Sequence, residues 1–163
     1  FSVSAGGLMV TNRHLVLNER GERPGDIAVQ FSGSRDVLPA RLERVASDVD
    51  LATIQLESQG PFPAVRGLAG DTIVAGSPIA LIGFPGGAGS GIPRATLVTG
   101  SVTRVVMDSL LEVDAFSGTG ASGSPIFDFR GRVIGVLFGG RGGSSSREVV
   151  GLPIRRAAAL LPQ

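Results

Sequence analysis

Short apolar runs recur along the chain, with polar or turn residues between them. In one of them Leu38, Ala40 and Leu42 alternate with Pro39, Arg41 and Glu43, the period-two pattern of a strand with one buried face. Strands at roughly 8–12-residue spacing favour an all-β sandwich or barrel over alternating strands and helices. The predicted strands are Gly7 to Val10, Ile27 to Phe31, Val37 to Val45, Leu51 to Leu56, Ile79 to Gly83, Thr96 to Val106, Leu110 to Ala115, Ile126 to Phe129, Arg132 to Phe138 and Glu148 to Leu152.

Helical periodicity is convincing only at the end of the chain, where Pro153 stands near the start of a predicted terminal helix. Two glycine-rich segments, Phe84 to Ile92 and Gly139 to Ser146, are instead typical of mobile loops. The apolar stripe of the helix consists of Ile154, Ala157, Ala158 and Leu161.

The composition narrows the class of protein. A chain of 163 residues with 42% hydrophobic residues can bury a core, which excludes disorder, and its longest apolar runs are too short for a membrane span. All fifteen basic residues are scattered arginines and the eight aromatic residues are all phenylalanine, which argues against nucleic-acid binding. The absence of cysteine excludes disulfides and thiolate metal sites. Because the chain starts at Phe1, we expect an excised or processed piece.

A glycine-rich turn surrounds Ser122 in the segment GASGSP, which precedes an apolar strand. A serine hydroxyl becomes a nucleophile only when a base takes its proton and nearby donors stabilise the oxyanion that forms. Glycines permit a sharp turn that exposes Ser122 Oγ and aims the amides of Gly120 and Ser122 at one point. Taken alone, the motif is equally an ordinary Gly/Ser-rich turn between strands.

Two further segments hold candidate partners for this serine. His14, the only histidine, lies in VTNRHLV, and Asp50 precedes an apolar strand in DVDLA. A lone histidine is more often a partly buried structural residue than a catalytic one, and an aspartate at this place can be a turn former. Only the combination of the three segments points to chemistry.

The order His14, Asp50, Ser122, each in its local context, resembles the trypsin-like serine peptidases of the chymotrypsin fold. The branches nearest in pattern are the bacterial HtrA/Deg-like peptidases and the glutamyl endopeptidases. The resemblance runs from about residue 6 to residue 161. Further matching segments are ALIGFP at 80–85, Asp114 eight residues before the serine, and GRVIGVLFGG at 131–140.

The resemblance implies an all-β fold of two six-stranded antiparallel barrels, with the first strand truncated and a helix at the C-terminal end. We expect one peptidase domain over residues 1–163. Its N-terminal barrel would cover about residues 1–70, its C-terminal barrel about 71–152 and its terminal helix 153–161. Because upstream residues of the opening strand are missing, we expect either an exposed sheet edge or another segment that covers this edge.

In this family the histidine acts as general base and then as acid, the aspartate fixes its tautomer and the serine attacks the carbonyl. The resemblance therefore assigns these roles to His14, Asp50 and Ser122. Asp48 is the rival acid, but the family's acid directly precedes a Leu-Ala pair, which selects Asp50. Ser124 is the rival nucleophile, but it lacks a following glycine and is next to a proline.

The resemblance also implies substrate contacts. The amides of Gly120 and Ser122 would form the oxyanion hole, and Phe138, Gly139 and Gly140 would pair with an extended peptide. A small or medium apolar side chain is the expected preference, since no pocket residue is negatively charged. An acidic side chain, supported by Arg141 and Ser117, is the alternative. The pocket is expected to be lined by Phe116, Ser117, Leu137 and Val149 or Val150.

Two residues depart from the family pattern. Ala121 stands where digestive trypsins have Asp and HtrA-like peptidases have Asn, and Phe138 stands where many relatives have a small hydroxyl residue. A triad misplaced by about 1 Å loses most activity. These departures support a second hypothesis, a catalytically silent pseudoprotease that binds peptides or acts as a scaffold. An esterase-type hydrolase is the third, although the chain lacks the strand-to-helix elbow of that class.

The expected partner is a polypeptide substrate, with no cofactor, no metal, no nucleic acid and no membrane span. A monomer is expected for this stretch of chain, and an oligomer is possible in a longer natural chain. The family resemblance favours a periplasmic or secreted location.

Overall fold

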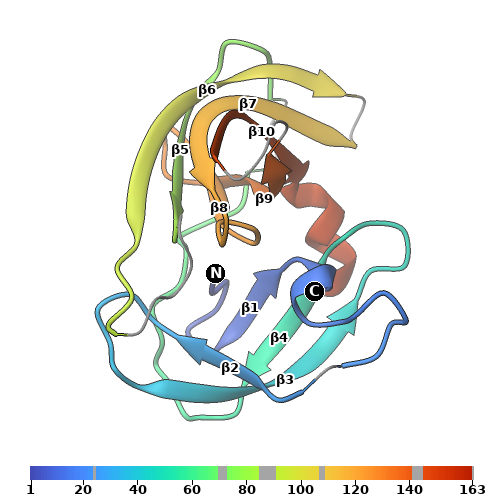
Figure 1. The fold of residues 1–163 in the computed structure, drawn as a ribbon, viewed down its shortest axis with the longest axis vertical. Helices are drawn as coiled ribbons and strands as arrows, with labels where there is room; N and C mark the ends of the chain where they lie inside the picture. Colours follow the sequence, from blue (N-terminus) through green and yellow to red (C-terminus); the bar gives the residue numbers. More distant parts are fainter. Residues whose placement is uncertain (24, 70–72, 85–90, 107–108, 141–144, 163) are drawn as a thin grey trace.

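The structure is a computed structural model that describes residues 1–23, 25–69, 73–84, 91–106, 109–140 and 145–162. Two β-sheets form two lobes, one from the first third of the chain and one from the rest (Figure 1). A short helix near the C-terminal end lies beside both lobes.

The first lobe is one curled antiparallel sheet with the strand order β1-β4-β3-β2 (Figure 1). Its inner face packs around buried Met9, Ala52, Ile54 and Leu56. β1 is an edge strand of this sheet, yet three of its four residues are buried, and Ser2 forms a β-bridge with Met9 on that strand. Its strands are β1 (Leu8–Thr11), β2 (Ile27–Gln30), β3 (Val37–Val45) and β4 (Ala52–Leu56).

The second lobe is a closed six-stranded barrel with the order β10-β7-β6-β5-β8-β9. Along β7, Leu111, Val113 and Ala115 point into the barrel core, while the residues between them are more exposed, as expected for alternation in a strand. Its strands are β5 (Pro78–Gly83), β6 (Thr96–Val106), β7 (Leu110–Gly118), β8 (Pro125–Asp128), β9 (Val133–Gly140) and β10 (Ser145–Pro153).

The all-β, two-lobed architecture expected from the sequence is confirmed, with one difference in the first lobe. In the described residues that lobe holds a four-stranded curled sheet where a second six-stranded barrel was expected. Residues 139–140 continue β9, and residues 145–146 begin β10, so the predicted loop over 139–146 is wrong at both ends. Residues 85–90 and 141–144, the centres of the two predicted glycine-rich loops, lie outside the described residues.

The terminal helix, η2 (Ile154–Leu160), is a 3₁₀ helix. Its buried residues are Ile154, Ala157 and Leu160, at a spacing of three, whereas Ala158 is exposed. This differs from the predicted stripe because a 3₁₀ helix has three residues per turn and stacks every third side chain on one face. No helix in the described residues is long and apolar enough to cross a membrane.

The helix η2 joins the two lobes. Its buried residues pack with Val10 and Leu51 of the first lobe and with Val133 and Leu152 of the second. Arg156 also forms an ion pair of 2.6 Å with Asp48, two residues before Asp50. The segment that carries Asp50 is therefore held against the C-terminal end of the chain.

Candidate active site

His14 and Asp50 are brought together by the pairing of β1 with β4. The antiparallel register sets Thr11 opposite Ala52, so the residues that follow β1 meet the residues that precede β4. His14 lies three residues beyond Thr11 in the 3₁₀ turn η1 (Arg13–Leu15), and Asp50 lies two residues before Ala52. Strand register alone thus places an imidazole beside a carboxylate.

Asp50 contacts His14 through both carboxylate oxygens. Oδ2 lies 2.6 Å from Nδ1 of the ring, and Oδ1 accepts a hydrogen bond of 2.9 Å from the backbone N–H of His14. An ionised carboxylate can only accept hydrogen bonds, so the ring proton is on Nδ1. In the neutral ring Nε2 then carries a lone pair and can act as a base.

The backbone of Asp50 is fixed as well. Its carbonyl oxygen accepts hydrogen bonds from Asn12 Nδ2 at 3.0 Å and from the N–H of Arg13 at 3.3 Å. Asn12 is fully buried, and its Oδ1 has no hydrogen-bond partner among the described residues. This positioning role of Asn12 was not predicted from the sequence, although its place two residues before His14 was a usable signal.

Ser122 lies in a tight loop between β7 and β8. Gly120 and Gly123 have φ angles of +92° and +81°, in the left-handed region that favours glycine. The N–H of Gly123 donates to the carbonyl of Leu137 at 2.9 Å, which anchors the loop on β9. A Cβ on Gly123 would lie 3.0 Å from Thr11 Oγ1, so the loop packs closely against the first lobe.

Two backbone amides of this loop are free. Within the part of the chain that the structure describes, the N–H groups of Gly120 and Ser122 donate to no protein acceptor, whereas those of Ala121 and Ser124 do. A pair of unused amides, one from the serine itself and one from the residue two positions before it, can supply the two donors that an oxyanion requires. The two are the residues predicted for the oxyanion hole.

Phe138 contacts both halves of the site. Its carbonyl oxygen accepts a hydrogen bond of 3.2 Å from Ser122 Oγ, and its ring meets the His14 ring edge to face, with centroids 6.1 Å apart. Among the described residues no hydrogen bond joins Ser122 Oγ to His14. Phe138 therefore contacts Ser122 through its carbonyl oxygen and His14 through its ring, and the serine hydroxyl is directed to that carbonyl.

The rival residues have other surroundings. The side chain of Asp48 is 70% exposed and forms an ion pair with Arg156, whereas the His14 ring is paired with Asp50. Ser124 is 7% exposed, and its hydroxyl packs against Gly83 of β5. Among the described residues Asp48 makes no contact with His14, and the Ser124 hydroxyl has no histidine or carboxylate partner.

The residues expected to form the side-chain pocket lie in two environments. Phe116 is 46% exposed on β7, whereas Leu137 and Val149 are each 1% exposed and belong to the barrel core. Ser117 and Val150 are also buried. Phe116 thus has the largest accessible surface of this set. Arg141, the basis of the acidic alternative, lies outside the described residues.

The alanine at position 121 fits the apolar environment around it. Its methyl group is 1% exposed and packs in the barrel core with residues such as Ala115 and Leu137. A carboxylate or amide at this position would need a polar partner in an apolar environment. The alanine is therefore consistent with the core that surrounds it.

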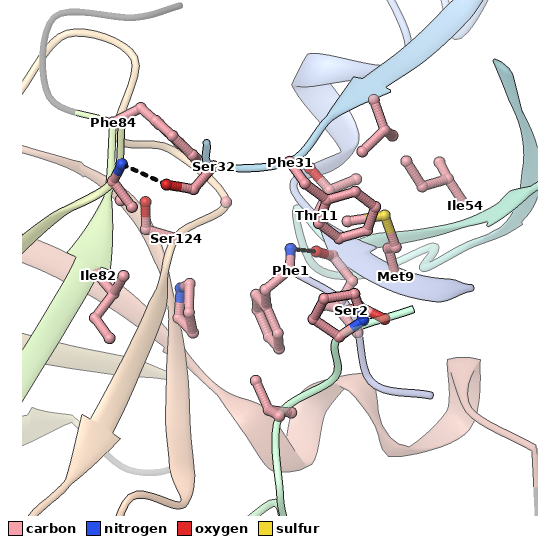
Figure 2. A pocket seen from close by; sticks show the side chains of 18 of the residues that line it. Phe1, Ser2, Met9, Thr11, Phe31, Ser32, Ile54, Ile82, Phe84 and Ser124 are labelled. Atoms are coloured by element: carbon pink, nitrogen blue, oxygen red, sulfur yellow. Dashed lines mark hydrogen bonds between the residues drawn. The ribbon is translucent and has the colours of Figure 1, made fainter. Parts of the chain in front are cut away.

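Two hollows adjoin the site. A cavity of about 710 Å³ lies between the lobes and reaches Gly120 and Ser122. Figure 2 shows Phe31 and Ile54 of the first lobe on one side of it and Ile82 of the second on the other. A second hollow of about 820 Å³ borders His14 and Asp50 on the side of the segment 17–21. Solvent can therefore reach the imidazole–carboxylate pair.

The chain matches known proteins over most of its length. The family model described as "Trypsin-like peptidase domain" matches residues 1–136. A "Probable periplasmic serine endoprotease DegP-like" of Rickettsia prowazekii is 29% identical over 143 residues, covering 83% of this chain and 26% of the relative. A "Serine protease HTRA2, mitochondrial" of Drosophila virilis is 32% identical over 145 residues, covering 83% and 32%. The chain thus spans about a quarter to a third of these curated relatives.

The solved structure described as "HtrA-type protease AlgW with decapeptide" superposes with a TM-score of 0.79 at 24% identity, covering 96% of this chain and 48% of that one. This likeness defines the class of fold as chymotrypsin-like. The chain belongs to the family of trypsin-like peptidase domains.

Proposed function

We propose that this chain is the peptidase domain of a serine endopeptidase that cleaves polypeptides with His14, Asp50 and Ser122 as its catalytic triad. The observation that carries the proposal is the pair of contacts between Asp50 and His14, which leaves Nε2 of the ring as a base. The free amides of Gly120 and Ser122 and the membership of the family support it.

Acylation starts when the Ser122 hydroxyl gives its proton to His14 Nε2 and Oγ bonds to the scissile carbonyl carbon. The carbonyl electron pair moves to oxygen, and the N–H groups of Gly120 and Ser122 donate to the oxyanion. The imidazolium then gives its proton to the amide nitrogen as the C–N bond breaks. An amine leaves, and the acyl group stays as an ester on Ser122.

Deacylation repeats these steps with water. A water molecule gives a proton to His14 Nε2, and its oxygen bonds to the ester carbon. The oxyanion collapses, the bond to Ser122 Oγ breaks, and the proton on the ring returns to Oγ. Asp50 stays ionised throughout and stabilises the imidazolium of both steps.

We propose that an extended peptide pairs with residues 138–140 of β9. The strand β8 ends its pairing with β9 at Val136, and among the described residues Gly123 and Ser124 hydrogen-bond to the next residue of β9, Leu137. A free strand edge beside a nucleophile can accept a peptide as an added strand. Exposed Phe116 and the absence of a described acidic pocket residue support a small or medium apolar side chain next to the cleaved bond.

A periplasmic or secreted location is proposed from the bacterial relatives whose names state a periplasmic one. The mitochondrial relatives show that the same domain also occurs elsewhere.

Hydrolysis of fluorescein-labelled casein tests the proposal. The protein should release labelled peptides, Ser122→Ala should release none, and Ser124→Ala should keep the activity because its hydroxyl has no base. Peptide binding without cleavage, unchanged by Ser122→Ala, would instead favour the second hypothesis, a peptide-binding module.

A further inference from the structure

Phe138 stands outside the regular pairing of its strand. In the ladder between β9 and β10, Val150 is opposite Gly139 and Gly151 is opposite Leu137, so Phe138 between them has no partner in β10. An extra residue of this kind is a β-bulge, which turns its backbone groups out of the ladder. The carbonyl of Phe138 is thus available to a donor outside the sheet.

That donor is the Ser122 hydroxyl. Ser122 Oγ lies 3.2 Å from the Phe138 carbonyl oxygen, and no other acceptor is recorded for it among the described residues. A hydroxyl has one proton and can donate it to one acceptor at a time. While it is given to Phe138, it is not given to Nε2 of His14, and the nucleophile is not activated.

The same residue keeps the base in place. The ring of Phe138 is 42% exposed, and it meets the His14 ring at an interplanar angle of 88°. Edge-to-face contacts of this kind are favourable and depend on orientation. The imidazole thus has two partners, the carboxylate of Asp50 at Nδ1 and the ring of Phe138.

The following inference rests on the function proposed above. We propose that Phe138 is a positioning residue, whose carbonyl holds the Ser122 hydroxyl away from His14 until a peptide N–H binds that carbonyl. A peptide whose scissile carbonyl lies against Ser122 brings the N–H of the same residue to the open edge of β9. In this proposal the peptide N–H displaces the hydroxyl from the Phe138 carbonyl. The displaced hydroxyl then turns to Nε2, which the Phe138 ring has kept in position.

The competition can be measured with two inhibitors that differ by one donor. The first is a tripeptidyl diphenyl phosphonate with valine at the reacting residue, and the second has an ester oxygen in place of that residue's N–H. If the N–H releases Ser122, the ester-containing inhibitor should have a kinact at least about fivefold lower than the inhibitor with the N–H. A factor of this size corresponds to the loss of one neutral hydrogen bond. A contact that only binds the peptide would raise KI and leave kinact unchanged.

The contact between the Phe138 and His14 rings can be tested with separate variants. Phe138→Leu keeps the strand carbonyl and an apolar side chain but removes the ring from His14, and should lower kinact about threefold to tenfold with little change in KI. Phe138→Tyr keeps the ring and should restore kinact. Phe129→Leu, at an exposed phenylalanine in the β8–β9 turn, is the matched control and should behave like the parent.

The outcomes separate this inference from the proposed function. Equal kinact values for the two phosphonates, with Ser122 labelled by both, would overturn the role of the Phe138 carbonyl and leave the peptidase proposal standing. A Phe138→Leu variant with the parent's kinact would overturn the role of the ring. No adduct on Ser122 with either phosphonate would overturn the peptidase proposal and this inference with it.

Discussion

Asp50 and His14 are joined twice, by a carboxylate–imidazole contact of 2.6 Å and by a backbone hydrogen bond of 2.9 Å. The second contact fixes the main chain at His14, so the carboxylate is positioned even before the ring binds it. Two independent contacts from one carboxylate set both the place and the tautomer of the proposed base.

The tautomer can be reversed by one substitution. In Asp50→Asn the amide nitrogen can donate to Nδ1, which puts the ring proton on Nε2 and removes the base. We expect the rate of casein cleavage to fall by about 10⁴-fold, the effect of a wrong tautomer in this type of triad. The far-ultraviolet circular dichroism should stay that of the parent. A loss of less than tenfold would contradict the role of Asp50.

Gly123 tests how the serine loop is held. Gly123→Ala should destabilise the protein by about 2–3 kcal/mol, since a Cβ at φ +81° is strained by about 1–2 kcal/mol and would also crowd Thr11 and Leu15. Gly131→Ala is the matched control, with φ +74° and open space around the new Cβ, and should lose only the strain. Urea denaturation gives both values. Equal losses would mean that the contact with the first lobe is unimportant.

Ala121 tests the apolar character of the core beneath the serine. Ala121→Asp buries an unpaired carboxylate and should lower the free energy of unfolding by about 3–5 kcal/mol. Thr119→Asp adds the same charge at an exposed position two residues away, where a change within about 0.5 kcal/mol is expected. A stable Ala121→Asp protein would show that the position has a polar partner.

Asp128 makes the β8–β9 turn sensitive to acid. Burial raises the pKa of Asp128, but hydrogen bonds from Arg132 and Arg130 outweigh it and hold the pKa below its ordinary value of 3.8. Because the folded pKa is lower than the unfolded one, the carboxylate stabilises the protein above the unfolded value. This contribution is lost as pH falls through the folded pKa.

Asp128→Asn removes that contribution. The variant should be less stable than the parent by about 1–2 kcal/mol at pH 7, and the difference should shrink toward pH 3. Urea denaturation at several pH values measures both proteins. A difference that stays constant between pH 7 and pH 3 would contradict the assigned cause of the pKa shift.

Most strands could be predicted because alternation and turn residues are local signals. The run Val37 to Val45 is observed as β3 with the predicted bounds. The terminal helix was predicted, but its 3₁₀ form was not, because the spacing of Ile154 and Ala157 fits both kinds of helix. In the 3₁₀ helix Ile154 and Ala157 pack in one cluster with Val10 and Leu51 of the first lobe, and such a contact is not visible in a local pattern.

The candidate site also has a part that could be predicted from the sequence and a part that could not. The contact between His14 and Asp50 follows from two local motifs and the register of two strands, which family resemblance supplies. The partner of Ser122 Oγ could not be predicted, because it depends on a bulge at Phe138 between two strands. From the sequence, Phe138 was predicted to pair with the peptide and was noted as a departure from the family pattern. Neither point indicated that its carbonyl and its ring contact Ser122 and His14.

The most direct test of the central claim is the site of reaction with a small fluorophosphonate. The incubation is made long enough for labelling through the minor fraction of Ser122 hydroxyls that turn from the Phe138 carbonyl to His14 without a peptide. After incubation, intact mass and peptide mapping should show one adduct on Ser122, absent from Ser122→Ala and strongly reduced in His14→Ala. Ser124→Ala should be labelled like the parent. No adduct, or an adduct that His14→Ala forms at the parent's rate, would contradict a serine activated by His14.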